Sequence, residues 1–187
     1  MDFIPVKEKF EIIVDQHPNP ENLNKRLLED IEDWGYDYSY ATNVKAKMSN
    51  SKSSFKSVDR VHELVNSLLN NPYNDGAKFS LFDTFNINWY DTWVARYDIG
   101  DYTIPHCHNL TATYSFVYFI QCPKGSSPLV FTHSNKRIKA EAGKLVVFDS
   151  SIFHHVPRNK CNGRIVLAGN GQVIRKGDKL IINESET

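Results

Sequence analysis

Two stretches in the first half of the chain place hydrophobic residues at helical spacing. The first stripe repeats every three or four residues and consists of Leu23, Leu27, Ile31 and Trp34. The second has the same spacing and consists of Val58, Val61, Val65 and Leu68. Asn19 and Pro20 provide an N-cap and a first-turn proline for the first stripe, and Pro72 ends the second. The pattern predicts two helices that each bury one face, against a sheet.

From about Phe79 onward, short runs of β-branched and aromatic residues alternate with polar turn clusters. The runs predict strands near residues 84–89, 92–98, 113–121, 129–132, 144–148, 152–157, 164–168 and 179–182. No long helix separates them, which favours an antiparallel barrel or jelly roll with the two helices buttressing one outer face. No linker or repeat indicates a second domain. We therefore expect one domain over residues 1–187, with helical support over about 1–78 and a barrel over about 79–183.

Composition and charge narrow the choice of partners. The 187 residues are 41% hydrophobic, which fits one domain with a sizeable core. The chain has 22 Lys and Arg residues and 22 Asp and Glu residues, so its formal net charge is zero. The charge therefore gives no reason to expect nucleic acid or an anionic membrane as a partner. No apolar run approaches the ~20 residues that span a bilayer, and the N-terminus does not resemble a secretory signal. We expect a cytoplasmic protein without a membrane partner.

Histidines cluster in two short segments that carry candidate metal chemistry. Residues 100–108 contain His106 and His108, and side chains two apart on a strand point to the same face. Residues 143–157 bring His154 onto a strand far downstream. A His-x-His pair with a distant third histidine is typical of a three-ligand metal site that leaves positions open to substrate.

The downstream segment contains two adjacent histidines, and only one of them is predicted to bind the metal. Strand alternation points His155 to the face opposite His154. The register with Gly143 and the His-x-Val pattern favour His154 as the ligand. His155 is then a packing or surface residue.

Arg164 follows His154 by ten positions, on the apolar run 163–168. Its guanidinium is permanently charged and planar, which suits bidentate binding of a carboxylate. An arginine on the solvent side of an edge strand is the simpler explanation when the residue is taken alone. Together with the three histidines, Arg164 predicts a carboxylate-binding position beside a metal.

These residues resemble the iron(II)- and 2-oxoglutarate-dependent oxygenases of prolyl-hydroxylase type. The segment 95–106 is similar to their strand in which Tyr-x-x-Gly precedes the first ligand, and 148–154 is similar to their segment before the distal histidine. Arg164 matches the arginine that binds the far carboxylate of 2-oxoglutarate. The similarity is closest to a bacterial and phage group with His-x-His at the first ligand pair, and it covers about 93–170.

The resemblance implies a double-stranded β-helix fold and a hydroxylation reaction that consumes 2-oxoglutarate and O2. It implies Fe(II) bound by His106, His108 and His154, with 2-oxoglutarate chelating the metal and paired with Arg164. It also implies that Tyr97 and Tyr118 line the cosubstrate pocket. A bacterial or phage source would place the protein in a bacterial or host cytoplasm. The residues do not identify the primary substrate.

Two positions depart from the family pattern. His108 stands where the common site has a carboxylate, so the site lacks one negative charge; this weakens the binding of divalent iron and permits zinc, copper or nickel. Val166 stands where many members have a serine that hydrogen-bonds the cosubstrate.

Two alternatives keep the barrel and the three histidines. Residues 100–108 fit the opening motif of a metal-binding cupin, a dioxygenase or isomerase that does not use 2-oxoglutarate. However, Ala112 and Thr113 occupy the positions of the cupin glutamate. A non-catalytic metal-binding barrel is the second alternative. Arg164 favours the oxygenase over both.

Overall fold

A computed structural model describes residues 10–32, 42–49, 57–70, 85–108 and 110–175. None of the helices in these ranges combines the length and the hydrophobicity needed to cross a bilayer. The elements follow one another as β1 Ile12–Gln16, α1 Pro20–Glu32, β2 Val44–Lys45, β3 Lys47–Met48, α2 Val58–Asn70, β4 Phe85–Tyr97, β5 Tyr102–His106, β6 Tyr114–Gln121, β7 Leu129–Phe131, β8 Lys136–Ile138, β9 Lys144–Asp149, β10 His154–Val156 and β11 Arg164–Arg175.

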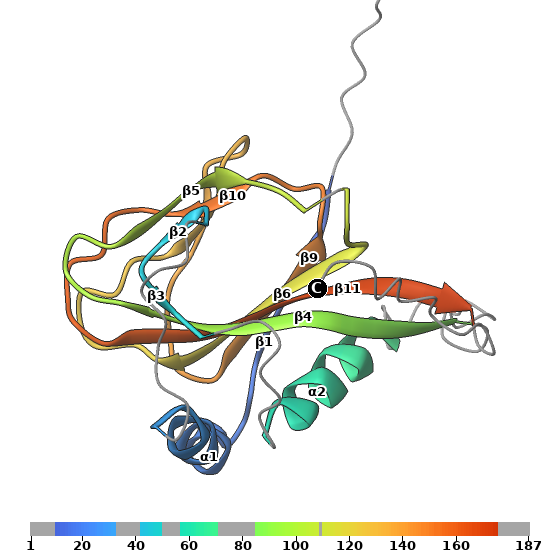
Figure 1. Ribbon diagram of the computed structural model, residues 1–187, viewed down its shortest axis with the longest axis horizontal. Helices are drawn as coiled ribbons and strands as arrows, with labels where there is room; N and C mark the ends of the chain where they lie inside the picture. Colours follow the sequence, from blue (N-terminus) through green and yellow to red (C-terminus); the bar gives the residue numbers. More distant parts are fainter. Residues whose placement is uncertain (1–9, 33–41, 50–56, 71–84, 109, 176–187) are drawn as a thin grey trace, which may run out of the picture.

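Two antiparallel sheets face each other (Figure 1). The larger sheet has the strand order β1-β9-β6-β11-β4-β3, and the smaller has the order β2-β5-β10-β7-β8. Buried side chains of both sheets, among them Phe119 and Val166 of the larger and Leu129 and Val156 of the smaller, form one hydrophobic cluster between them. This arrangement confirms the expected jelly-roll architecture.

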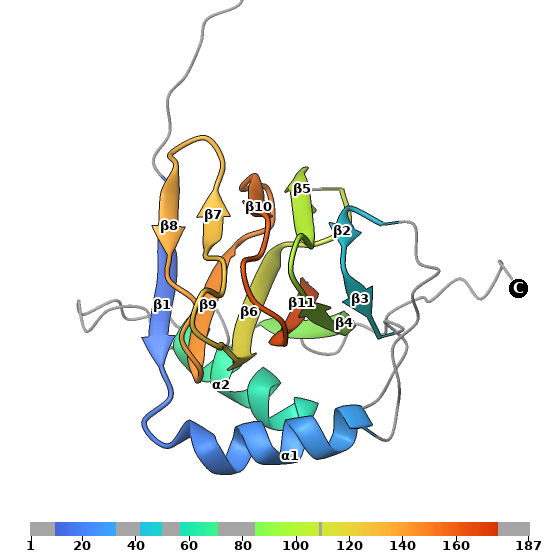
Figure 2. The same cartoon turned by 90° about the vertical axis from the view of Figure 1, so that its left-hand side faces the viewer.

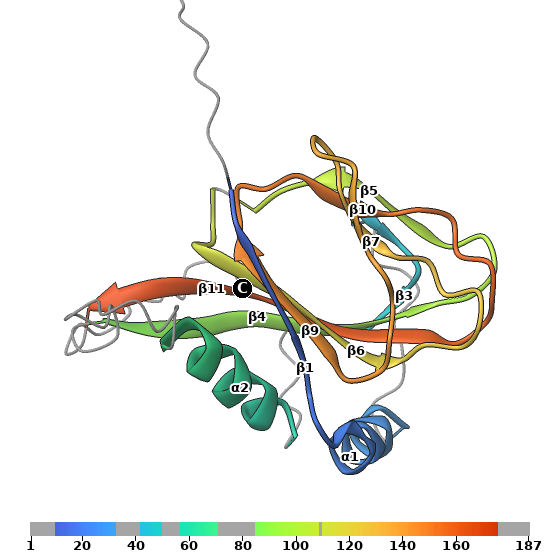
Figure 3. The ribbon, with the colours of Figure 1, turned by 180° about the vertical axis from the view of Figure 1, so that it is seen from behind.

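The larger sheet is buried on both faces. Along β6, Val117 and Phe119 point into the barrel, whereas Phe116, Tyr118 and Ile120 belong to a second cluster on the outer face. The buried side chains of α1 and α2 complete that second cluster. The two helices therefore buttress one outer face, as predicted (Figure 3).

Both helices bury most of the predicted stripes; Leu68 of α2 is half-buried, and Leu69 is buried in addition. Leu23, Leu27 and Ile31 of α1 are buried, and so are Val61 and Val65 of α2. Asn19 precedes α1, which begins at the predicted first-turn proline. Trp34 lies outside the described residues.

The structure corrects several strand boundaries. The two strands predicted over 84–89 and 92–98 are one continuous strand, β4, because β11 pairs with it along nearly its whole length, with one register shift between Asn170 and Gly171. The strand predicted at 179–182 lies outside the described residues.

The first part of the chain also contributes strands, not helices alone. β1 pairs with β9, β2 with β5 and β3 with β4. As a result β2 and β3 connect the two sheets along one side of the barrel (Figure 2). β2 and β3 have only two residues each, which is too short to show periodicity, and this explains why the pattern did not predict these two strands.

Candidate metal centre and adjoining cavities

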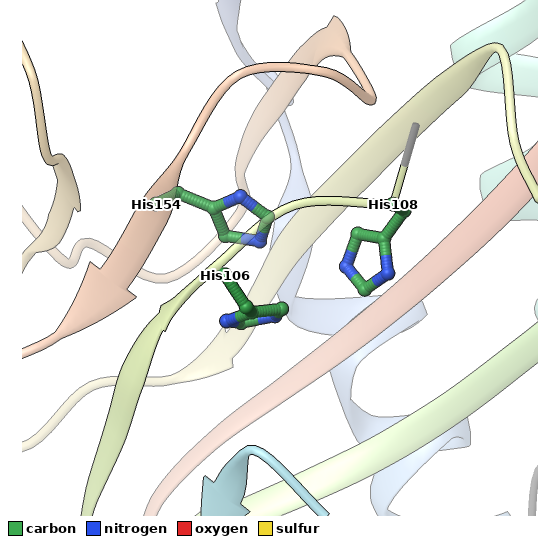
Figure 4. Close-up of side chains that lie close together, drawn as sticks. All are labelled: His106, His108 and His154. Atoms are coloured by element: carbon green, nitrogen blue, oxygen red, sulfur yellow. The ribbon is translucent and has the colours of Figure 1, made fainter. Parts of the chain in front are cut away.

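Three histidines come together at one end of the barrel. His106 ends β5 and His154 begins β10, and these two residues are direct cross-strand partners. One ligand atom from each of His106, His108 and His154 lies within 4.8 Å of the others. Figure 4 shows the three rings grouped around a shared space. The neighbouring His155 instead contacts Thr132 Oγ1 through its Nδ1, at 2.9 Å.

Backbone carbonyls fix the orientation of two of the rings. Nδ1 of His106 lies 2.8 Å from the oxygen of Ile104, and Nδ1 of His154 lies 2.9 Å from the oxygen of Ile152. A carbonyl oxygen can only accept, so in both rings Nδ1 carries the proton. The Nε2 atoms keep their lone pairs available for a metal, which is the usual arrangement of metal-binding histidines.

His108 reaches the group from a loop, and this corrects the expectation that the pair shares a strand. β5 ends at His106. The amide of His108 donates to the oxygen of Ser150 at 2.7 Å, which ties this loop to the turn after β9. The His108 ring lies beside Asn170 Nδ2, 3.4 Å from its Nδ1, and near the ring of Trp93.

The environment keeps all three imidazoles neutral. Burial is the main cause that lowers the pKa of each ring, to about 4 for His108 and about 3 for His154. Burial also lowers the pKa of His106. Neutral imidazole is the form that binds metal, so the group is ready to coordinate a divalent ion at neutral pH.

Arg164 is completely buried in the barrel, which excludes the solvent-side alternative. Its Nε donates to the oxygen of Ser127 at 2.9 Å, and its guanidinium lies over the rings of Tyr97 and Phe119. Nη1 and Nη2 have no hydrogen-bond partner among the residues that the structure describes. Because an uncompensated buried charge is costly, these two groups indicate a missing anionic partner.

Two cavities meet at the histidines. The inner one, about 40 Å³, extends from His106 and His154 to Arg164 and Tyr97. The outer cleft, about 240 Å³, is lined by His106 and His108. Val44, Trp93 and His106 line both. The three histidines therefore stand between an inner cavity with a buried cation and an outer cleft.

The two predicted tyrosines have different positions. Tyr97 lines the inner cavity, and its hydroxyl is 2.8 Å from Thr103 Oγ1. The expectation for Tyr118 is wrong: its hydroxyl donates to Asn24 Oδ1 of α1 at 2.8 Å, on the outer face of the larger sheet. Successive side chains of β6 point to opposite faces of the sheet, and Tyr118 lies on the face that the helices cover.

The sequence analysis missed two polar residues at this site. Thr103 contributes a hydroxyl to the inner cavity, and Asn170 contributes an amide to the outer cleft. A signal for Asn170 was present, since it follows Arg164 by six positions and therefore shares its face of the strand.

Comparisons of the sequence with family models and with curated proteins give no match. Solved structures do match. A viral collagen prolyl hydroxylase from Paramecium Bursaria Chlorella virus-1, as its 2OG complex, superposes with a TM-score of 0.63 at 14% identity, over 86% of this chain and 94% of that one. A Pseudomonas putida prolyl-4-hydroxylase gives 0.62 at 15% identity, over 86% and 92%.

A Trichoplax adhaerens prolyl hydroxylase, in complex with a hypoxia inducible factor peptide fragment, gives a TM-score of 0.60 at 11% identity, over 85% and 82% of the two chains. At these identities the likeness establishes the fold. The chain has the double-stranded β-helix fold of the prolyl-hydroxylase-like 2-oxoglutarate and iron(II) oxygenases, which confirms the resemblance at the level of structure.

Proposed function

We propose that the protein is an iron(II)- and 2-oxoglutarate-dependent oxygenase that hydroxylates a second substrate. The observation that carries this proposal is the pair of Arg164 Nη groups, which have no hydrogen-bond partner among the described residues and are buried in the cavity that His106 and His154 also line. A dicarboxylate that chelates a metal at one end and meets a guanidinium at the other matches these two features.

The donor set fits a divalent transition metal. Three neutral imidazoles suit iron, and also zinc, copper and nickel. His106, His108 and His154 would hold the ion, facing both cavities. When bound, iron(II) and 2-oxoglutarate supply the oxidation: O2 is consumed, 2-oxoglutarate becomes succinate and CO2, and a C–H bond of the second substrate becomes C–OH.

The inner cavity fits the far end of 2-oxoglutarate. The two Nη groups of Arg164 would donate to its carboxylate in the bidentate geometry that guanidinium favours. Tyr97 stacks on the guanidinium and, with Thr103, adds a hydroxyl pair to the wall. Leu129 and Val166 line the rest, so the pocket excludes water and strengthens the ion pair. Val166 adds no hydrogen bond where many relatives carry serine.

The chemistry of Arg164 also favours this function over the two alternatives. A cupin that does not use 2-oxoglutarate, or a metal-binding barrel without a reaction, has no need for a buried guanidinium in the cavity that His106 and His154 line. The second substrate would enter through the outer cleft.

The direct test is an anaerobic titration of 2-oxoglutarate into the iron(II)-loaded protein, followed by calorimetry, together with succinate formation under air. Arg164→Ala should bind iron as the parent does and lose most of its 2-oxoglutarate affinity. Arg175→Ala is the matched control, because Arg175 is an exposed arginine at the other end of the same strand. Unchanged affinity in Arg164→Ala would contradict the proposal.

A further inference from the structure

The guanidinium of Arg164 is oriented by one hydrogen bond and by contacts with two aromatic rings. Its Nε donates to the carbonyl oxygen of Ser127 at 2.9 Å. Its central carbon lies 4.6 Å from the ring centre of Tyr97 and 5.3 Å from that of Phe119. These contacts determine where Nη1 and Nη2 lie, and therefore where a carboxylate can be bound.

One buried amide, that of Asn159, is bonded to the main chain of both Ser127 and Tyr97. Its Oδ1 accepts from the N–H of Ser127 at 2.9 Å, and its Nδ2 donates to the oxygen of Tyr97 at 3.1 Å. Nδ2 also donates to the oxygen of Cys161 at 2.7 Å. Because a backbone N–H only donates and a carbonyl oxygen only accepts, these bonds fix the orientation of the amide. Asn159 is 2% exposed, so water hardly competes for them.

The main chain of Asn159 holds a neighbouring turn. Its N–H donates to the oxygen of Asp101 at 2.7 Å, and its carbonyl oxygen accepts from the N–H of Gly100 at 2.9 Å. This turn joins β4, which carries Tyr97, to β5, which carries Thr103. Asn159 therefore connects the segment before β11 with the turn between two strands that form walls of the inner cavity.

Asn159 does not itself line the inner cavity. The described residues around that cavity include Arg164, Tyr97 and Thr103, but neither Asn159 nor Ser127. An effect of Asn159 on a bound carboxylate must therefore pass through residues that touch the ligand. Arg164 is the residue that both of its bonded partners contact.

We propose that Asn159 is a positioning residue that fixes the distance between the metal site and the guanidinium of Arg164, and thereby selects the five-carbon 2-oxoglutarate over its longer homologue. This inference rests on the proposed function. A guanidinium held in one place binds a carboxylate in bidentate geometry only when the chain between carboxylate and metal has the matching length. Without the bonds to Ser127 and Tyr97 the guanidinium gains freedom, so 2-oxoglutarate binds more weakly and the longer homologue is rejected less.

The test compares two ligands. Calorimetric titrations of 2-oxoglutarate and of 2-oxoadipate, which is one methylene longer, into anaerobic iron(II)-loaded protein give two dissociation constants and their ratio. Partial unfolding weakens both ligands by the same factor, so the ratio reports the geometry of the site and not the stability of the protein. We expect Asn159→Ala to bind 2-oxoglutarate at least about tenfold more weakly and to reduce the preference for it at least about threefold, with unchanged iron affinity.

A matched control and a second variant separate positioning from folding. Asn24→Ala removes another buried asparagine, which accepts from Tyr118 on the outer face of the larger sheet, and it should lower stability without changing the ratio. Asn159→Ser leaves a smaller cavity than the alanine variant, but its hydroxyl is too short to bond both Ser127 and Tyr97. In either Asn159 variant Ser127 Oγ can still donate to the oxygen of Arg158, 2.9 Å away, so the fold should persist.

A double-mutant cycle shows whether Asn159 acts through Arg164. In Arg164→Lys the Nε that bonds Ser127 is absent. Adding Asn159→Ala to that variant should therefore weaken 2-oxoglutarate binding by less than about a further twofold. A loss as large as in the parent background would mean that Asn159 affects the pocket by another route.

The inference would be overturned, while the proposed function stands, by equal binding of the two 2-oxo acids to the parent, by an unchanged ratio in the Asn159 variants, or by additive losses in the cycle. Failure of the parent protein to bind iron(II) or 2-oxoglutarate would contradict the proposed function, and the inference about Asn159 would fail with it.

Discussion

Arg164 and Tyr97 are direct cross-strand partners on β11 and β4, and the guanidinium carbon lies 4.6 Å from the centre of the tyrosine ring. The stacked ring stabilises a buried cation without neutralising it. Burial raises the pKa of Tyr97, so its hydroxyl stays protonated and no phenolate competes for the charge. The pair therefore presents an arginine whose two Nη groups remain available to a ligand.

Replacing Arg164 with lysine tests the bidentate geometry separately from the charge. Arg164→Lys keeps a cation but loses the planar pair of donors. We expect about 10- to 100-fold weaker binding of 2-oxoglutarate, the equivalent of one lost charge-assisted hydrogen bond. Calorimetric titration of the iron-loaded variant measures it. An affinity for 2-oxoglutarate equal to that of the parent would show that the planar pair of donors is not needed for binding.

A change at His108 tests the three-histidine ligand set. His108→Asp restores the negative charge that the common two-histidine, one-carboxylate site has. We expect tighter binding of Fe(II), measured by competition with a chelator under anaerobic conditions. His133→Asp, at an exposed position in the turn after β7, is the control and should not change it. Unchanged iron affinity in His108→Asp would mean that residue 108 does not reach the metal.

The burial of His62 should make the free energy of unfolding depend on pH. This ring stacks on Trp89 and contacts Thr92 Oγ1, and burial lowers its pKa to about 4. The unfolded chain takes up this proton near pH 6.5, so the folded state loses stability as pH falls from about 6.5 to 4, by at most about 3 kcal/mol. Above pH 6.5 the ring has no effect.

Urea unfolding of the metal-free protein measures this loss between pH 7 and pH 4. His62→Phe should show a shallower decline than the parent over that window, because the titrating group is absent. Equal slopes for the two proteins would show that His62 titrates normally in the folded state.

Tyr118 should matter for stability and not for the cofactors. Tyr118→Phe removes the hydrogen bond to the buried Asn24 and should destabilise the protein by about 1–3 kcal/mol, since Asn24 loses its partner. Binding of 2-oxoglutarate should equal that of the parent. Weakened 2-oxoglutarate binding with unchanged stability would place Tyr118 at the pocket after all.

The contrast between Arg164 and Tyr118 shows which features the sequence could reveal. A charge within an apolar strand is conspicuous, and it indicated a buried ligand-binding position. The two faces of the larger sheet are both buried, so the residues around Tyr118 are apolar on either side and do not alternate. Hydrophobicity alone could not assign the face on which Tyr118 lies.

The sequence could predict that the three histidines come together, but not that one of them reaches the group from a loop. The spacing of His106 and His108 suggested one strand, whereas His108 reaches the group through a loop held by Ser150. Such a loop depends on a tertiary contact with the turn after β9, which local spacing does not reveal.

The most direct measurement of the central claim is a crystal structure of the protein grown anaerobically with iron(II) and N-oxalylglycine. Anomalous scattering at the iron edge should place one ion between His106, His108 and His154, and a carboxylate of the analogue should accept from both Nη groups of Arg164. An ion bound elsewhere, or an analogue that leaves Arg164 untouched, would contradict the assignment.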